Sequence, residues 1–252
     1  MRDFPITLLF WTSTKGHFGR KDDYLWTIDH LDGQMTREFS GRIAHVKTTP
    51  GEEAVAEQMM EQLDRRGFET HITMGAWARG TSHQLAYMED VRRISKLPQV
   101  YENQYIAWWE DDSPVVCLKD PLDVVLDRML YHIDSSPEAL SARFIRKGDY
   151  DGGVPSLLDA GDHWYSPHTD FQPAIWRSRD FYLAAKAIED NWDRVQNIQC
   201  EQLWRMVTDS FSAVPTRHLV WHPSYAHTEH LGVPSLDHEA VLARLGLVAK
   251  PL

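Results

Sequence analysis

The sequence predicts an α/β fold with a mainly parallel central sheet, helices flanking the sheet and an elaborated carboxyl-terminal half. Three observations lead to this prediction. Short apolar stretches alternate with amphipathic stretches four times in the first half, which is typical of parallel strands joined by helices. A long polar segment interrupts this alternation in the second half. The 252 residues, 42% of them hydrophobic and 25% charged, suit one large folded domain.

The first half is expected to hold four strand–helix units. We expect strands over residues 6–11, 43–46, 68–74 and 105–109. We expect the helices that follow them over residues 24–31, 49–63, 81–94 and 122–133. Apolar residues recur most regularly, at intervals of three and four, from Leu122 to Ile133. The apolar run Ile6–Trp11 is shorter than the apolar region of a secretory signal, and no cleavage site of small residues follows, so a buried strand is favoured.

The second half is expected to be less regular. We expect strands over residues 139–145 and 219–221, and helices over residues 181–190, 198–207 and 236–245. Residues 147–173 are rich in Gly, Asp, His and Pro, with weak periodicity, and are expected to form a long loop of the kind that often carries function. No internal repeat or linker interrupts the chain, so we expect one domain.

Charge and cysteine content exclude several classes of protein. The net charge of −11 gives no general attraction to phosphate backbones or to membrane surfaces. The two cysteines, Cys117 and Cys200, exclude a disulfide framework, a four-cysteine zinc site and an iron–sulfur cluster held by cysteines alone. No apolar run approaches the roughly 18 residues of a membrane span. A reducing, cytoplasmic location is therefore expected.

Three adjacent carboxylates, Glu110–Asp112, follow the fourth expected strand. Such groups repel one another, and a buried position for them requires a cation or several hydrogen-bond donors. Mg²⁺ or Mn²⁺ meets this need, because these ions use one or two carboxylates together with substrate phosphates. A solvated acidic turn explains the residues equally well when they are taken alone. Their place at the carboxyl edge of the sheet favours a ligand site, and Trp108 and Trp109 are expected to shape a pocket there.

This arrangement resembles the metal-binding acidic motif of nucleotide-sugar-dependent glycosyltransferases of the GT-A fold. The resemblance implies a single Rossmann-like GT-A domain over 1–252, with a nucleotide-sugar-binding half, 1–116, and an acceptor-binding half, 117–252. It implies a hexosyltransferase-like enzyme that uses Mn²⁺ or Mg²⁺ to move a sugar from a nucleotide-diphosphate donor to an acceptor hydroxyl.

The resemblance also assigns roles within the triplet. Asp112 is implied as the principal metal ligand, Asp111 as a contact to the donor ribose or the metal, and Glu110 as their support. Glu110 stands where the commonest D-x-D spelling of the motif begins with Asp, which leaves open which carboxylate binds the metal and whether the donor is a UDP-sugar.

Further donor contacts are implied in two loops. The loop after the first strand contains Thr12, Ser13 and Lys15, whose hydroxyl and ammonium groups suit a nucleotide. It lacks the residue order of a Walker loop. Arg79, at the entry to the third expected helix, is implied to face a donor phosphate.

The carboxyl-terminal half supplies the remaining implied residues. His230, with His227 as second choice, is implied to complete the metal shell. Glu201, in the first turn of an expected helix, is implied to act as the base of an inverting reaction, although a carboxylate there also interacts favourably with the helix dipole. The expected acceptor contacts are Trp164, Asp170 and Gln172.

Three alternatives remain open. A nucleotidyltransferase uses the same fold and also clamps phosphates with carboxylates and a metal. A metal-dependent hydrolase would use Asp112 with His222, His227 and His230. A non-enzymatic binding module has little use for clustered carboxylates. Within the first interpretation the acceptor is a saccharide, a lipid-linked sugar, a protein or a modified nucleic-acid base, and the last requires basic residues such as Arg143, Arg146 and Lys147 beside the site.

Overall fold

The computed structural model describes the chain over residues 5–14, 22–75, 90–117, 120–136, 138–144, 158–159, 163–166, 173–195, 198, 206, 217–221 and 226–228. The helices in these ranges are α1 (Asp23–Gln34), α2 (Glu53–Asp64), α4 (Pro98–Tyr101), α5 (Leu122–Ser135), α7 (Ser178–Asp190) and α8 (Trp192–Val195). Residues 90–94 are also helical. The strands are β1 (Ile6–Ser13), β2 (Gly41–Thr48), β3 (Glu69–Met74), β4 (Tyr105–Glu110), β5 (Val115–Cys117), β6 (Ala139–Arg143), β7 (Leu158–Asp159), β8 (His163–Ser166), β9 (Ala174–Arg177), β10 (Arg217–Trp221) and β11 (Ala226–Thr228).

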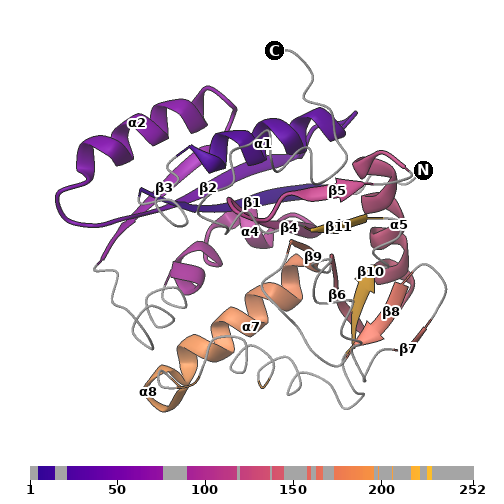
Figure 1. Ribbon diagram of the computed structural model, residues 1–252. Helices are drawn as coiled ribbons and strands as arrows, with labels where there is room; N and C mark the ends of the chain where they lie inside the picture. Colours follow the sequence, from indigo (N-terminus) through magenta and orange to yellow (C-terminus); the bar gives the residue numbers. More distant parts are fainter. Residues whose placement is uncertain are drawn as a thin grey trace.

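Within the described residues one nine-stranded sheet has the order β3-β2-β1-β4-β9-β6-β10-β8-β7 (Figure 1). The neighbours β3, β2, β1 and β4 pair in parallel, as do β6 and β10. Strands β9 and β8 run in the opposite direction to their neighbours on both sides. An α/β fold with a mainly parallel sheet is therefore confirmed.

The direction in which the sheet grows reverses between β1 and β4. The chain adds β2 and then β3 on one side of β1, and afterwards returns to add β4 on the other side. In open α/β sheets the loops at such a switch point separate beyond the carboxyl ends of the strands and leave a crevice for a ligand. A ligand site is therefore expected at the carboxyl ends of β1 and β4.

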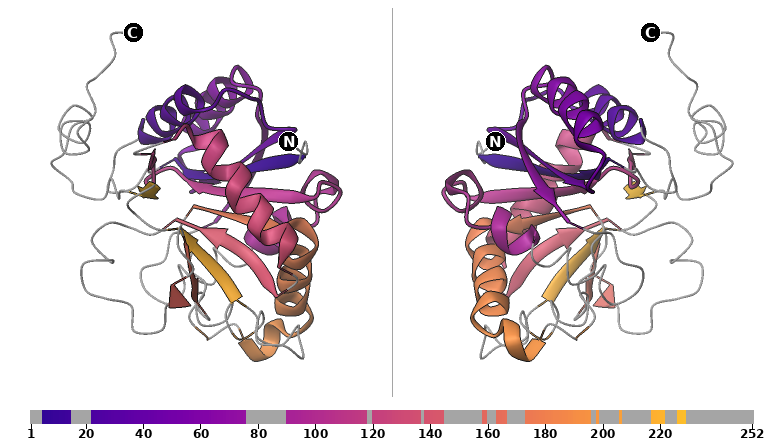
Figure 2. Two further views of the ribbon diagram at one scale, coloured as in Figure 1. Left: turned by 90° about the vertical axis from the view of Figure 1, so that its right-hand side faces the viewer. Right: turned by 90° about the vertical axis from the view of Figure 1, so that its left-hand side faces the viewer.

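Helices cover both faces of the sheet. One buried apolar cluster joins the sheet to α1, α2 and α5, and a second joins it to α7 and to residues 90–94 on the other face. Figure 2 shows α1 and α2 on one side and α7, in orange, on the other. Strands β1 and β4 are apolar on both faces because both are covered. Among the described helices none is both long and apolar enough to cross a membrane.

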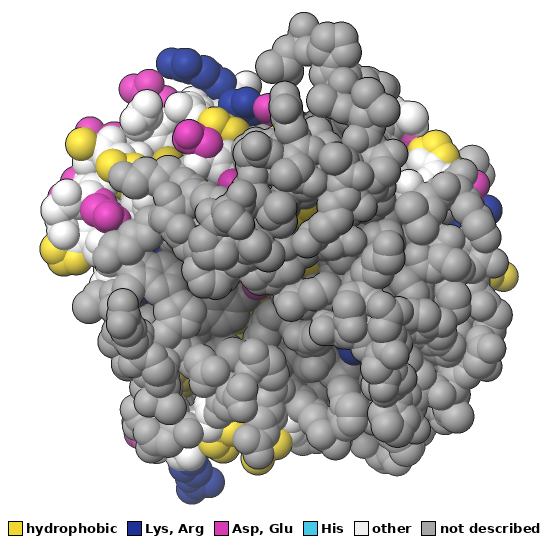
Figure 3. All heavy atoms as spheres, viewed as in Figure 1, with side chains coloured by type: hydrophobic (Ala, Val, Ile, Leu, Met, Phe, Trp, Pro, Cys, Tyr) yellow, Lys and Arg dark blue, Asp and Glu magenta, His cyan; other side chains and the backbone are white. Residues whose placement is uncertain are grey.

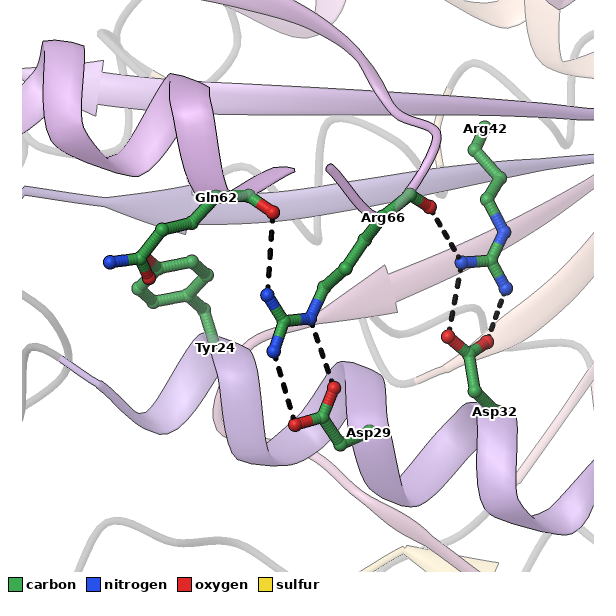
Figure 4. Close-up of polar contacts among 6 residues, drawn as sticks. All are labelled: Tyr24, Asp29, Asp32, Arg42, Gln62 and Arg66. Atoms are coloured by element: carbon green, nitrogen blue, oxygen red, sulfur yellow. Dashed lines mark hydrogen bonds and ion pairs between the residues drawn. The ribbon is translucent and has the colours of Figure 1, made fainter. Parts of the chain in front are cut away.

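A polar network fixes α1 to its neighbours (Figure 4). The Arg66 guanidinium, at the end of α2, donates to both carboxylate oxygens of Asp29 in α1 at 3.0 and 3.2 Å, and to the carbonyl oxygen of Gln62 at 3.4 Å. Arg42 of β2 pairs with Asp32 of α1 and donates to the carbonyl oxygen of Arg66 at 3.1 Å. One side of α1 is therefore held against α2 and β2.

The described surface near α2 is chemically mixed. Figure 3 shows acidic, basic and hydrophobic side chains side by side there. The edge strand β3 exposes Ile72 and Met74, with 38% and 56% of their surface accessible. This part of the surface therefore does not concentrate the net negative charge of the chain.

Most of the expected elements are confirmed. The strands expected over 6–11, 43–46, 68–74, 105–109, 139–145 and 219–221 correspond to β1, β2, β3, β4, β6 and β10. The helices expected over 24–31, 49–63, 122–133 and 181–190 correspond to α1, α2, α5 and α7. Of the helix expected over 81–94 only residues 90–94 are described, and these are helical. The helix expected over 236–245, and that over 198–207 apart from residues 198 and 206, lie outside the described residues.

The expectation of a long loop over 147–173 was wrong at two short strands. This segment contains β7 and β8, and β8 pairs with β10, whose residue His218 lies opposite Ser166. Strands this short carry little periodic signal. The pairing of β8 with the distant β10 supplies stabilisation that local propensity lacks, and β7 pairs with β8.

Candidate functional site

The acidic triplet lies in a loop at the end of β4 and is largely removed from water. Asp111 and Asp112 expose 9% and 5% of their surface, and Ser113 next to them exposes 3%. Glu110, the last residue of β4, is half-buried. The alternative of a solvated acidic turn is therefore wrong, because such a turn leaves its carboxylates in water.

Asp111 is held at three points by β1 and α1. Its backbone N–H donates to the carbonyl oxygen of Trp11 at 3.0 Å. The Thr12 hydroxyl donates to its Oδ2 at 2.7 Å, and the Thr27 hydroxyl donates to its carbonyl oxygen at 2.6 Å. The next carboxylate, Asp112, accepts a hydrogen bond from the Ser113 hydroxyl at 3.1 Å. The loop thus has a defined backbone path rather than the freedom of a surface turn.

The register of the strands explains why Thr12 meets Asp111. Trp11 of β1 lies opposite Glu110 of β4, so the next residues, Thr12 and Asp111, are also neighbours across the two strands. Because side chains alternate along a strand, Thr12 and Asp111 face the α1 side while Trp11 faces the other core cluster. Ser13, the last residue of β1, lies at the same edge. The structure therefore places Thr12 beside Asp111 and Ser13 at the same edge of the sheet.

Electrostatics disfavour ionisation of Asp111. Burial, then the charge of Asp112, raise the pKa of Asp111 from its ordinary value to about 7, and the charge of Asp23 acts in the same direction. The hydrogen bond from Thr12 lowers this pKa but does not offset the other effects. A positive charge placed beside these carboxylates would relieve both the repulsion and the cost of burial.

The carboxylate oxygens of Asp111 and Asp112 suit a hard divalent cation whose remaining ligands come from a bound molecule. Among the described residues no three His, Cys, Asp or Glu side chains converge into a preformed metal centre. Mg²⁺ and Mn²⁺ need no such centre when substrate phosphates complete their coordination, and carboxylate oxygens are ligands they favour. The pair Asp111 and Asp112 therefore suits this kind of ion better than a self-contained zinc site.

The expectation that Trp108 and Trp109 shape a pocket was wrong. They expose 2% and 0% of their surface and belong to the two core clusters on opposite faces of the sheet. Trp108 stacks on Trp11 with ring centroids 4.8 Å apart. Because β4 is covered on both faces, its consecutive tryptophans fill both cores instead of lining an opening.

The carboxyl-terminal histidine segment reaches the same edge at backbone level. Strand β11 pairs antiparallel with β5, and His227 lies opposite Val116. Residues 111–114, between β4 and β5, are called the acidic loop below. Strand β5 begins three residues after Asp112, so the backbone of His227 runs close to this loop. Trp164 lies on β8 opposite Val220.

The other expected site residues are not described. Lys15, Arg79, Asp170, Gln172, Glu201, His222 and His230 lie outside the described residues.

A second buried polar cluster, on the other face of the sheet, was not anticipated. The Lys47 ammonium donates to Asp90 at 2.7 Å, and His45 Nε2 lies 2.8 Å from the Thr73 hydroxyl. Burial raises the pKa of Asp90, and burial together with the charge of Lys47 lowers the pKa of His45 to about 3. His45 and Lys47 alternate with apolar Ala44 and Val46 in β2, which was the available signal that they share a face.

Comparison with known proteins gives weak structural likenesses. No protein-family model matches the chain, and no curated protein has a significantly similar sequence. The S. aureus TarS fragment 1–349 matches with a TM-score of 0.49 and 12% identity, over 90% of this chain and 60% of that one. The same fragment in complex with UDP-GlcNAc gives 0.49 and 10%, over 89% and 58%.

A second kind of protein matches over nearly its full length. A putative glucose-1-phosphate thymidylyltransferase from Bacillus anthracis, in complex with a sucrose, matches with a TM-score of 0.48 and 6% identity, over 96% of this chain and 94% of that one.

Proposed function

We propose that this protein is a glycosyltransferase that binds a nucleotide-diphosphate sugar and a divalent cation, Mn²⁺ or Mg²⁺, at the carboxyl ends of β1 and β4. The observation that supports this most strongly is the buried pair Asp111 and Asp112 at the switch point of the sheet. Two adjacent buried carboxylates cost stability, and a cation shared with a diphosphate offsets that cost.

Each residue of the edge has a role in the proposed site. Asp112 is the principal ligand of the cation. Asp111, fixed by the Thr12 hydroxyl at 2.7 Å, holds its carboxylate toward the donor ribose or the cation. Glu110 supports the pair, and Ser13 presents a hydroxyl at the end of β1.

The chemistry proposed for the site is displacement at the anomeric carbon of the donor sugar. When bound, the divalent cation neutralises the charge that develops on the departing diphosphate. The residues of the chain hold the donor in one orientation, and Lys15 and Arg79 add positive charge beside the phosphates. Asp111 and Asp112 are largely buried, which strengthens these electrostatic interactions.

The acceptor half completes the proposal. Glu201 takes the proton from the acceptor hydroxyl, which makes the enzyme inverting. His230, or His227, completes the coordination of the cation. Trp164, Asp170 and Gln172 contact the acceptor, which is a saccharide, a lipid-linked sugar, a protein or a modified nucleic-acid base.

A screen of nucleotide sugars by thermal shift, with and without Mn²⁺, tests the proposal. We expect one donor to raise the melting temperature in the presence of Mn²⁺ and to have little effect without it. Failure of every nucleotide and nucleotide sugar to stabilise the protein contradicts the proposal, and stabilisation by Zn²⁺ alone favours a hydrolase instead.

Product analysis separates the two transferase chemistries. Release of a nucleoside diphosphate from the donor indicates sugar transfer. Release of pyrophosphate from a nucleoside triphosphate and a sugar phosphate indicates nucleotidyl transfer, which the same pair of carboxylates serves equally well.

A further inference from the structure

Helix α1 presents a row of polar side chains to the acidic loop. Thr27, His30 and Gln34 are spaced three and four residues apart, which places them on one side of the helix. Thr27 is fully buried, and the other two are half-buried. Polar residues at buried positions of a helix need hydrogen-bond partners, and here the partners lie in the loop that follows β4.

All three side chains donate to backbone carbonyl groups on either side of Asp112. The Thr27 hydroxyl donates to the carbonyl oxygen of Asp111 at 2.6 Å. The Gln34 amide donates to the carbonyl oxygen of Val115 at 2.8 Å, and His30 Nε2 lies 3.1 Å from the same oxygen. Asp112 therefore stands between two carbonyl groups that one helix holds in place.

The protonation state of His30 is compatible with this role. Burial lowers the pKa of His30, so the ring is neutral at pH 7. A carbonyl oxygen only accepts hydrogen bonds, so the proton of the neutral ring lies on Nε2 and points to Val115. Trp26 stacks on the His30 ring with centroids 5.0 Å apart and planes 7° apart, which limits rotation of the imidazole.

The other side of α1 is anchored independently. Asp29 and Asp32 pair with Arg66 and Arg42, as Figure 4 shows, so the helix is fixed against α2 and β2. The bonds to the acidic loop are made from a side of the helix that does not depend on these ion pairs. Helix α1 therefore contacts the loop through Thr27, His30 and Gln34, which take no part in these ion pairs.

We infer that α1 positions the acidic loop for its ligand, and that Thr27, His30 and Gln34 are positioning residues for Asp112. This inference rests on the function proposed above and adds residues that touch neither cation nor donor. Val115, whose carbonyl group accepts the bonds from His30 and Gln34, is the first residue of β5. Because β5 pairs with β11, α1 is also connected to the backbone beside His227.

Two measurements on the full-length chain test the inference. The first is hydrogen exchange of the backbone amides over residues 111–117 without ligand. The second is Mn²⁺ affinity in the presence of UDP, GDP, ADP or CDP, from the electron paramagnetic resonance signal of free Mn²⁺. Thr27→Val removes the hydroxyl at nearly constant volume, and Thr27→Ser restores it. Asp29→Asn is the control, since it weakens the pair with Arg66 on the opposite side of α1.

We expect Thr27→Val to speed exchange in the loop and to weaken Mn²⁺ binding about fivefold or more, as the loss of one buried hydrogen bond implies. Thr27→Ser should bind like the wild type, and so should Asp29→Asn. Gln34→Met, at a less buried position, should also speed exchange in the loop and weaken Mn²⁺ binding. It replaces Thr27→Val in the test if that variant does not fold. Wild-type exchange and affinity in the folded variants would overturn the inference, as would an equal loss in Asp29→Asn.

A wild-type chain that binds Mn²⁺ with none of these nucleotides contradicts the proposed function instead. The exchange measurement then decides the inference by itself. Faster exchange over residues 111–117 in Thr27→Val supports α1 as the support of the loop, and unchanged exchange overturns it.

Discussion

The hydroxyl of Thr12 donates a hydrogen bond of 2.7 Å to the carboxylate of Asp111, although the two residues are 99 positions apart in the chain. This bond joins the carboxyl ends of β1 and β4 at the point where the growth of the sheet reverses. It also stabilises the ionised form of a carboxylate whose burial favours the neutral form. One hydrogen bond thus connects the topology of the sheet to the charge of the proposed site.

Thr12→Val should raise the pKa of Asp111 further, because it removes the donor that lowers this pKa. Cation binding then requires a higher pH, and Mn²⁺ affinity at pH 7 should fall about tenfold. The pH profile of Mn²⁺ binding measures the change. Thr7→Val is the matched control, since the Thr7 hydroxyl is also buried but bonds to the carbonyl oxygen of Gln99, toward the other end of β1. An equal shift in both variants would show that loss of any β1 hydroxyl suffices.

Asp111→Asn should stabilise the metal-free protein at pH 8. The folded-state pKa of Asp111 is raised to about 7, so the folded chain retains a proton that the unfolded chain releases near pH 4. The free energy of unfolding therefore falls as the pH rises between these values. This fall in the free energy of unfolding reaches about 4 kcal/mol above pH 7, and Asp111→Asn removes it. Urea unfolding at pH 5 and pH 8 measures it, and a variant that is no more stable than the wild type at pH 8 contradicts the prediction.

His45→Gln should make the protein less sensitive to acid. Burial and the charge of Lys47 lower the folded-state pKa of His45 to about 3, so the unfolded chain binds a proton near pH 6.5 that the folded chain does not. Stability is therefore lost as the pH falls from 6.5 toward 3, by about 2 kcal/mol at pH 5 from this residue. The slope of unfolding free energy against pH measures the effect. A slope equal to that of the wild type would mean that His45 does not titrate in this way.

Lys47→Met should destabilise the protein by about 3 to 5 kcal/mol, because it leaves Asp90 buried without its cation. A second substitution, Asp90→Leu, should recover part of this loss, because no charge then remains unpaired. Lys186→Met is the control. The Lys186–Asp190 pair has a similar distance of 2.6 Å but is exposed, so its loss should leave stability nearly unchanged. Equal losses at the two lysines would contradict the difference in burial as the cause.

Local periodicity predicted the parallel half of the sheet well. Strand β4 and helix α5 each carry a pattern that is complete within a few residues, and this pattern does not depend on distant partners. The position of Asp111 and Asp112 at the edge followed from the order of these elements. Strands β5, β8 and β11 were missed because each is short and owes its existence to a partner elsewhere in the chain.

The hydrogen bonds from α1 to the acidic loop could not be predicted from the sequence. Thr27 and Gln34 bond to backbone carbonyl groups, which every residue has, so no residue pattern identifies their partners. The alternation of β4 contained the information that Trp108 and Trp109 face opposite sides. The prediction of a pocket beside them was wrong because helices cover both faces of the sheet there.

Calorimetric titration of the donor identified by the nucleotide-sugar screen into wild type and Asp112→Asn, with and without Mn²⁺, tests the central claim most directly. We predict that the wild type binds this donor far more tightly with Mn²⁺ than without it. Asp112→Asn should keep its fold and lose more than about 100-fold of the Mn²⁺-dependent affinity. Binding by Asp112→Asn that equals the wild type in the presence of Mn²⁺ would contradict the assignment of this carboxylate pair as the cation and diphosphate site.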